Sequence, residues 1–194
     1  MVSRKTAMRR RRTLAIAAAV VTFSTIGFVS CDNESPADIP TAREEFITYA
    51  AEAAQESRDQ YGVPPSVAMA QAILESDWGS SQLTREGFAF FGIKCTGQSP
   101  HATGCAELPT TECDEDGCQK VMASFRTYDS PEDSFADYGY LLSSNSRYQP
   151  AFDHTEDPKM FAVAIANAGY ATDPEYSTKI INLIDEYNLY QYDE

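Results

Sequence analysis

One glutamate, Glu75, stands within a segment that is otherwise apolar. The hydrophobic residues around it recur at helical spacing: Val67, Met69, Ala70, Ile73 and Leu74. We predict Ser66 as the N-cap of this helix and Gly79 as its C-terminal stop. Glu75 would then lie in the last turn, where the helix dipole and apolar neighbours raise the pKa of a carboxyl group. A glutamate that retains its proton can act as the general acid that cleavage of a glycosidic bond requires.

Two other side chains of this helix are expected beside Glu75. Gln71 precedes it by four residues and Trp78 follows it by three, so helical geometry places all three on one face. The alternative is an exposed glutamate on an ordinary amphipathic helix. The segment alone does not separate the two interpretations, and the rest of the chain is needed.

Local signals predict a mainly helical domain around this segment. A capping box at 41–44 opens a helix that runs to about residue 60 and stops at Tyr61-Gly62. Ser130-Pro131 opens another helix through about residue 142, and Asp157-Pro158 and Asp173-Pro174 open two more. Extended segments are expected at 90–95 and 121–128, the second alternating as a half-buried strand does. The predicted fold class is therefore α+β, mainly α, with a small inserted β-hairpin.

The first thirty residues have the composition of an export signal. They contain six Lys and Arg, no Asp or Glu, and an apolar run from Leu14 to Val29 that is short for a membrane span. We predict a signal peptide at 1–30, a tether at 31–43 and a folded domain at 44–192. Without the signal, nine Lys and Arg remain against 29 Asp and Glu, a net charge of about −20. A charge of this sign argues against a nucleic-acid partner.

Cys31 ends the apolar run and precedes the tether, a position that resembles a lipoprotein processing site. If Cys31 is lipidated, the protein is anchored to the outer face of the membrane. The alternative is an ordinary cleaved signal that happens to carry a cysteine near the cut, which releases the protein. Both interpretations predict an exported protein.

Four more cysteines fall within 24 residues: Cys95, Cys105, Cys113 and Cys118. Their spacing does not form the two CxxC knuckles of a common zinc site, so disulfides are expected in an exported chain. Three pairings are possible and the sequence does not choose among them, although Cys95 with Cys105 and Cys113 with Cys118 is the most local. His101 and His154 stand alone, and we expect neither a metal nor a cofactor.

Several blocks of the sequence, in order, resemble one known family. The blocks occupy residues 61–66, 71–81, 91–94, 123–128, 143–148 and 168–176, and the similarity runs from about residue 44 to 192. They resemble the bacterial glucosaminidase domain of glycoside hydrolase family 73, whose members cut peptidoglycan and share a lysozyme-like fold. The resemblance implies that Glu75 is the catalytic acid on its helix.

The same resemblance implies further site residues. Thr110-Thr111-Glu112 matches a segment in which the glutamate is a candidate second carboxylate, so we predict Glu112 as base or charge stabiliser. Tyr170 corresponds to a tyrosine that lines the active groove. Phe91 and Tyr128 are candidates for apolar contacts with sugar rings, and Gln71 and Trp78 complete the predicted substrate-binding set.

We therefore predict an exported, monomeric hydrolase that cuts peptidoglycan glycan strands at the N-acetylglucosaminyl β-1,4 linkage. Cleavage of the other glycan bond, by a muramidase or a lytic transglycosylase, is the nearest alternative. A lytic transglycosylase needs one acidic residue, so it would suit a chain in which Glu112 is dispensable. A catalytically idle wall-binding domain is the alternative from another class.

Overall fold

The computed structural model describes residues 34–114 and 117–194, with side chains at 111–118 outside that description. The predicted signal peptide and Cys31 also lie outside it. The helices are α1 Arg43–Tyr61, α2 Pro65–Ser76, α3 Gln82–Gly87, α4 Pro131–Ser144, α5 Pro158–Asn167 and α6 Tyr176–Glu186, with short 3-10 helices η1 Pro36–Asp38, η2 Ser146–His154 and η3 Leu189–Tyr192. The strands are β1 Gly104–Asp114 and β2 Gly117–Thr127. In the described residues, no helix is long and apolar enough to cross a membrane.

The central helix of the fold is α2, which contacts α1, α5, α6 and η3. Its prediction as a helix is confirmed, but both of its ends differ from expectation. Ser66 is not the N-cap; it is fully buried inside the helix, and Pro64 occupies the cap position without a side-chain cap. The carboxylate of Asp193 accepts a hydrogen bond from the Ser66 backbone N–H at 2.8 Å instead. A residue distant in sequence thus satisfies one of the exposed donors at the helix start.

The C-terminal end of α2 comes at Ser76, earlier than the predicted stop at Gly79. Asp77 and Trp78 already adopt left-handed backbone conformations, and Gly79 continues them at φ 72°. A Cβ atom on Gly79 would lie 2.7 Å from side-chain atoms of Ile39 and Phe46. Glycine is therefore required here for close packing against α1 as well as for the turn.

The helix α1 begins at Arg43, and the expected capping box at its start is not formed. Ala42 is the N-cap, and no side chain caps this end. The predicted end is confirmed, because Gly62 adopts φ 76° and its N–H bonds the carbonyl of Arg58. The described part of the expected tether also packs against the domain: Ile39 is 3% exposed, and Arg85 donates to its carbonyl at 2.6 Å.

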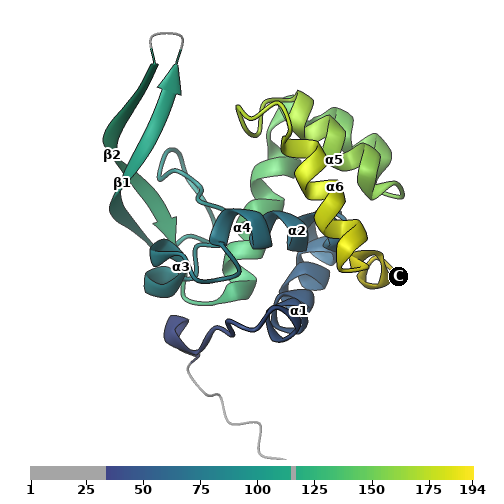
Figure 1. The fold of residues 1–194 in the computed structure, drawn as a ribbon, viewed down its shortest axis with the longest axis horizontal. Coiled ribbons are helices and arrows are strands. Elements are labelled where there is room, and N and C mark those ends of the chain that lie inside the picture. Colours follow the sequence, from purple (N-terminus) through teal and green to yellow (C-terminus); the bar gives the residue numbers. More distant parts are fainter. Residues whose placement is uncertain (1–33, 115–116) are drawn as a thin grey trace, which may run out of the picture. The chain divides into compact units, whose positions relative to one another are not determined.

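The β-hairpin differs from the prediction in its first strand. The predicted strand at 90–95 makes only an isolated bridge between Lys94 and Phe125, and β2 pairs with β1 at 104–114. The register runs antiparallel from Gly104 opposite Thr127 to Asp114 opposite Gly117. Figure 1 shows the hairpin standing on the side of the helices away from α5 and α6. The first strand of the hairpin is therefore formed by the segment that contains Cys105 and Cys113.

The predicted openings of two later helices are confirmed. Ser130 caps α4 by accepting from the Asp133 N–H, and Asp157 caps α5 by accepting from the Met160 N–H at 3.1 Å. Asp173 does not cap α6 directly. That helix starts three residues later at Tyr176, whose backbone N–H bonds the Asp173 carbonyl.

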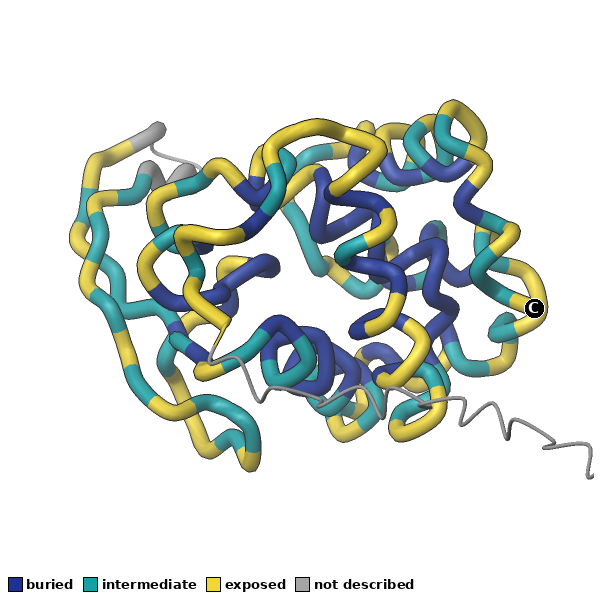
Figure 2. Tube along the Cα trace, turned by 90° about the horizontal axis from the view of Figure 1, so that it is seen from below, coloured by how far each residue is buried: buried dark blue, intermediate teal, exposed yellow. Residues whose placement is uncertain are grey.

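The hydrophobic core lies among the helices, and the hairpin contributes little to it. Figure 2 shows buried positions concentrated in the helical part and mainly intermediate or exposed positions along the hairpin. The largest fully buried side chains include Phe46, Phe90, Phe135, Tyr138 and Phe161. The helical part is thus a packed support for groups that lie at its edge.

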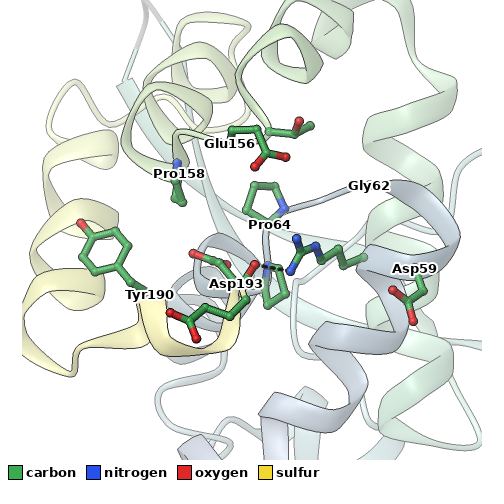
Figure 3. Close-up of a pocket in the computed structure, with 11 residues that line it drawn as sticks. Asp59, Gly62, Pro64, Glu156, Pro158, Tyr190 and Asp193 are labelled. Carbon is green, nitrogen blue, oxygen red and sulfur yellow. Dashed lines mark hydrogen bonds between the residues drawn. The ribbon is translucent and has the colours of Figure 1, made fainter.

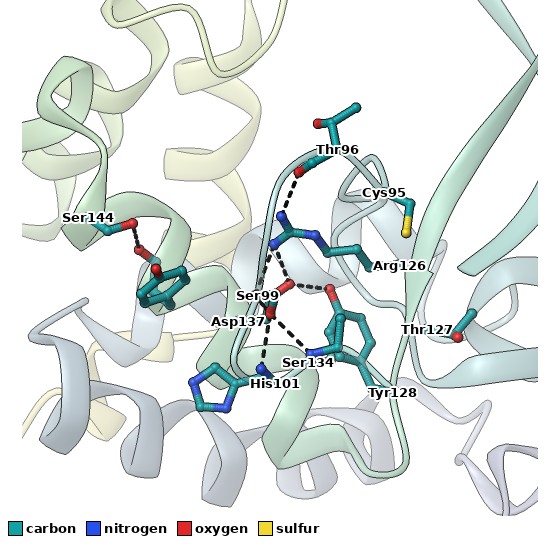
Figure 4. Close-up of polar contacts among 12 residues, drawn as sticks. Cys95, Thr96, Ser99, His101, Arg126, Thr127, Tyr128, Ser134, Asp137 and Ser144 are labelled. Carbon is teal, nitrogen blue, oxygen red and sulfur yellow. Dashed lines mark hydrogen bonds and ion pairs between the residues drawn. The ribbon is translucent and has the colours of Figure 1, made fainter. Parts of the chain in front are cut away.

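A buried ion pair joins the hairpin to this support. Arg126 of β2 donates to both carboxylate oxygens of Asp137 on α4, at 3.0 and 2.9 Å, and to the carbonyl of Thr96. The hydroxyl groups of Tyr128 and Ser99 also donate to Asp137, as Figure 4 shows. The Cys95–Cys105 disulfide closes the segment that contains Thr96 and Ser99. Of the three possible pairings, this disulfide agrees with the most local one, which joins Cys95 to Cys105.

We expect Asp137→Asn to destabilise the protein by about 3–5 kcal/mol, because it leaves the charge of Arg126 buried without a carboxylate. Chemical denaturation at neutral pH measures the difference. The matched control is Asp185→Asn, which removes the Lys159–Asp185 pair, whose side chains are each 47% exposed. That control should cost no more than about 1 kcal/mol. Equal effects of the two substitutions would contradict the role given to Asp137.

Candidate active site

Glu75 lies where two hollows meet at the edge of the helical part. The helical-side hollow has a volume of about 440 Å³, and its lining includes Phe91, Tyr148 and Tyr170. The hairpin-side hollow has a volume of about 470 Å³, and its lining includes Leu108 and Phe125. Glu75 and Gly92 line both hollows, which we call together the Glu75 groove. A chain-like ligand in this groove would pass the carboxyl group of Glu75.

The pKa of Glu75 is raised, mainly because protein atoms surround much of the carboxyl group and desolvate its charged form. Glu75 is nevertheless an exposed residue, so its side chain is accessible from the groove. The hydroxyl of Tyr176 donates to Glu75 Oε1 at 2.8 Å, and this hydrogen bond lowers the pKa in opposition to the desolvation. Glu75 is thus a solvent-accessible carboxyl group with an increased tendency to hold a proton.

An aromatic wall surrounds Glu75 on the helical side. Tyr138 stacks on Phe91 with ring centroids 4.2 Å apart, and Tyr170 stacks on Tyr176 at 5.7 Å. Tyr170 also contacts Tyr138 edge to face and lies against Tyr148. These rings desolvate the glutamate, and those that line the groove, Phe91, Tyr148 and Tyr170, offer the kind of apolar surface on which sugar rings pack.

Arg147 fixes the loop that presents Tyr170. Its guanidinium group donates to the carbonyl oxygens of Ala168 and Gly169 at the end of α5. Gly169 adopts φ +78°, and a Cβ atom there would lie 2.6 Å from the Arg147 side chain. The loop therefore holds Tyr170 half-buried against the wall.

The structure brings some of the other predicted residues together and separates others. Gln71 lies beside Glu75 as helical spacing predicted, because both bond the hydroxyl of Tyr176, but it is fully buried and is not among the residues that line the groove. Tyr128 is buried beneath the hairpin, where it bonds Asp137. Trp78 packs edge to face against Tyr187 at 4.9 Å. Neither Tyr128 nor Trp78 is among the residues that line the groove. For Trp78 the reason is the left-handed turn after Ser76, which carries this side chain away from the helix face that helical spacing predicted.

Glu112 belongs to β1, where its Cα partner is Gln119. Its side chain lies outside the described residues, so its predicted catalytic role remains a prediction. The side chains of Cys113 and Cys118 also lie outside the described residues, so a disulfide between them remains a prediction. Their Cα atoms are partners in the hairpin register.

Sequence reasoning missed two important groups beside Glu75. Tyr138 is a core residue of α4, and Tyr176 begins α6 and bonds Glu75 directly. Tyr176 stands in the last of the blocks that carried the family resemblance, but no role was inferred for it. Helical spacing alone could not identify either residue, because each meets Glu75 only through tertiary packing.

Another cavity, of about 510 Å³, lies at the opposite end of α2 (Figure 3). Asp59, Glu156 and Asp193 line it together with Arg58, whose guanidinium donates to the Asp193 carbonyl. Its most desolvated acid, Asp193, is engaged as the cap of α2. This cavity is larger than either hollow of the Glu75 groove taken alone, but it lacks the aromatic wall, so the Glu75 groove is the better candidate for an active site. In the described part of the chain, no three His, Cys, Asp or Glu side chains are grouped to hold a metal ion.

A mainly helical domain with one two-stranded hairpin and a glutamate at the end of its central helix has a lysozyme-like α+β architecture. The family model described as mannosyl-glycoprotein endo-beta-N-acetylglucosaminidase matches residues 51–189. The chain belongs to this glucosaminidase family. The catalytic domain of the autolysin Auto from Listeria monocytogenes is structurally similar, with a TM-score of 0.69 and 32% identity over 79% of this chain and 89% of that one.

Two relatives extend the comparison. The chain is 35% identical over 181 residues to the peptidoglycan hydrolase FlgJ of Pseudomonas aeruginosa, covering 87% of this chain and 45% of the relative. It is 34% identical over 154 residues to the exo-glucosaminidase LytG of Bacillus subtilis, covering 77% and 53% respectively. The chain thus spans about half the length of these two relatives.

We expect Glu75→Gln to make the protein more stable than the wild type at pH 7. Because the pKa of Glu75 is raised by folding, the wild type loses stability as the pH rises through that raised pKa. The substitution removes the ionisation, so the gain should disappear below about pH 4.3, the ordinary pKa of glutamate. Thermal unfolding across this pH range measures the effect. A variant less stable than the wild type at pH 7 would contradict the desolvation of Glu75.

Proposed function

We propose that the protein is a peptidoglycan hydrolase that cuts glycan strands at the N-acetylglucosaminyl β-1,4 linkage, as an endo-β-N-acetylglucosaminidase. The observation that carries the proposal is a carboxyl group with a raised pKa, Glu75, at the junction of two hollows with an aromatic wall on one side. Membership of the glucosaminidase family and similarity to a named peptidoglycan hydrolase support it.

In the proposed reaction, Glu75 protonates the glycosidic oxygen as the bond to it breaks. Partial desolvation suits this role, because it raises the pKa of the Glu75 carboxyl group and so favours its protonated form. Tyr170, which Arg147 holds in the helical-side hollow, positions the sugar or the attacking group. Positive charge then develops on the sugar ring, and a second carboxylate can stabilise it or activate water.

We propose Glu112 for the second role. Side chains alternate along a strand, so position 112 belongs to the same set as Leu108 and Thr110. Both of these residues line the hairpin-side hollow, and so does Pro109 between them, so this part of β1 borders the hollow. Position 112 lies two residues, about 7 Å of strand, beyond Thr110 toward the hairpin tip. Movement of the hairpin toward the helices would be the means of bringing Glu112 to the reacting bond.

The proposed substrate requires the protein to act outside the cytoplasmic membrane. The expected signal at 1–30 would export it, and a lipid on Cys31 would anchor it to the outer face of the membrane. These residues lie outside the described part of the chain. Mass spectrometry of the mature N-terminus would distinguish an acylated Cys31 from an ordinary cleaved end.

Purified protein should release N-acetylglucosamine reducing ends from peptidoglycan sacculi, and Glu75→Gln should reduce the rate by about 10²- to 10⁴-fold through loss of the acid. Asp77→Asn is the matched control: Asp77 is exposed, and asparagine tolerates its left-handed backbone. This control should retain wild-type activity. Equal activity of wild type and Glu75→Gln would contradict the assignment of the acid.

The released ends also separate the alternatives. New N-acetylmuramic acid reducing ends would identify a muramidase, and anhydro-muramic ends a lytic transglycosylase. Glu75 is the sole carboxylate among the described residues that line the groove, which is the specific observation in favour of a transglycosylase. Sacculi that bind the protein without any release of ends would identify a wall-binding domain.

We expect Glu112→Gln to lower the rate on sacculi by about 10²- to 10⁴-fold if Glu112 supplies the second carboxylate. Binding to sacculi should be retained, so sedimentation with the polymer is measured beside the rate. Glu107→Gln is the control on the same strand, because Glu107 is exposed and belongs to the alternate set of positions. A Glu112→Gln variant as active as this control would exclude Glu112 from the mechanism.

A further inference from the structure

A chain of three hydrogen bonds runs from the core to Glu75. The hydroxyl of Tyr138 donates to Gln71 Oε1, Gln71 Nε2 donates to the Tyr176 hydroxyl oxygen at 2.7 Å, and that hydroxyl donates to Glu75 Oε1 at 2.8 Å. Tyr138 and Gln71 are fully buried, and Tyr176 is 4% exposed. Bulk water therefore does not compete for the inner two bonds.

The amide of Gln71 gives this chain a direction. An amide oxygen only accepts hydrogen bonds, and an amide nitrogen only donates them. Tyr138 occupies the oxygen, so Gln71 presents its N–H to Tyr176, whose oxygen must accept it. The single hydroxyl proton of Tyr176 is then left for Glu75. The Oε1 atom is consequently held as an acceptor.

The two oxygens of Glu75 are therefore not equivalent. Oε1 accepts the hydrogen bond from Tyr176, and the carbonyl oxygen of a carboxylic acid is a better acceptor than its hydroxyl oxygen, so this bond favours the proton on the other oxygen. Oε2 carries no such constraint, because Tyr176 bonds Glu75 through Oε1 alone. Among the described residues, Tyr176 is the hydrogen-bond partner of Glu75, and Glu75 itself lines both hollows.

We propose that Tyr138, Gln71 and Tyr176 are positioning residues that keep Glu75 Oε1 as an acceptor and so place the catalytic proton on Oε2, the oxygen that Tyr176 does not bond. The proposal rests on the acid role of Glu75 in the proposed function. It adds the groups that orient the acid before substrate arrives. Such preorientation avoids a rearrangement of the proton during the reaction.

Other groups also face Glu75, and their charges set the background of any titration. Tyr138 on α4, Tyr170 after α5 and Tyr176 on α6 all have pKa values raised by desolvation, so they remain neutral where Glu75 titrates. The charged side chains that line the helical-side hollow are Lys94, Arg126 and Arg147. Arg126 is paired with Asp137, and Arg147 bonds backbone carbonyls.

The test compares Tyr176→Phe and Gln71→Met with the wild type. Tyr176→Phe keeps the ring that stacks on Tyr170 and removes the donor, so the pKa of Glu75 should rise and kcat should fall by about 10- to 100-fold. Gln71→Met leaves the Tyr176 hydroxyl free to turn, so it should shift both quantities in the same direction. Carbon-13 NMR of the Glu75 carboxyl group, assigned by its absence in Glu75→Gln, gives the titration.

Tyr187→Phe is the matched control, because it removes a tyrosine hydroxyl that bonds Arg43 at 2.6 Å outside the groove. It should leave the Glu75 titration and kcat unchanged. If Tyr176→Phe lowers kcat while the Glu75 titration stays at the wild-type position, or changes neither quantity, the proposal is wrong. If the variants shift the Glu75 titration as expected but the wild type cuts no sacculi, the proposed function is contradicted and the positioning role remains supported.

Discussion

The hydrogen bond from Tyr176 to Glu75 joins the last turn of α2 to the first residue of α6, and the geometry of the groove depends on it. A carboxyl group at the C-terminal end of a buried helix is unfavourable as an anion, since both desolvation and the helix dipole oppose its charge. The fold surrounds this group with tyrosines from α4, α6 and the loop after α5. The opposing contributions leave a carboxyl group that faces solvent and has a raised pKa. The rest of the helical part fixes the positions of these rings.

The features that the sequence predicted correctly are those set by neighbouring residues. Ser130-Pro131 and Asp157-Pro158 open helices because a side-chain oxygen and a proline act within one turn. Gly62 ends α1 for a similar local reason. The pairing of Gln71 with Glu75 follows from helical geometry, which is equally local. These signals were sufficient to predict the mainly helical fold class and the position of Glu75 in the last turn of α2.

The features that it missed depend on distant contacts. Ser66 was expected to cap α2, but Asp193, 127 residues away, supplies the acceptor. The first strand was expected at 90–95, whereas the hairpin register pairs β2 with the cysteine-rich segment. Tyr138 meets Gln71 only because α4 packs beneath the groove, so its spacing in sequence carries no sign of that role. Tertiary packing determines each of these outcomes.

The central claim is that Glu75 acts as a proton donor to the leaving group, and a change of leaving group tests it most directly. Rates of wild type and Glu75→Gln would be compared on two substrates: a natural glycan oligomer and an aryl glycoside of the same sugar, whose dinitrophenolate leaves without protonation. The account predicts a loss of about 10²- to 10⁴-fold on the natural oligomer and nearly equal rates on the aryl glycoside. An equally large loss on both substrates would contradict the acid role of Glu75.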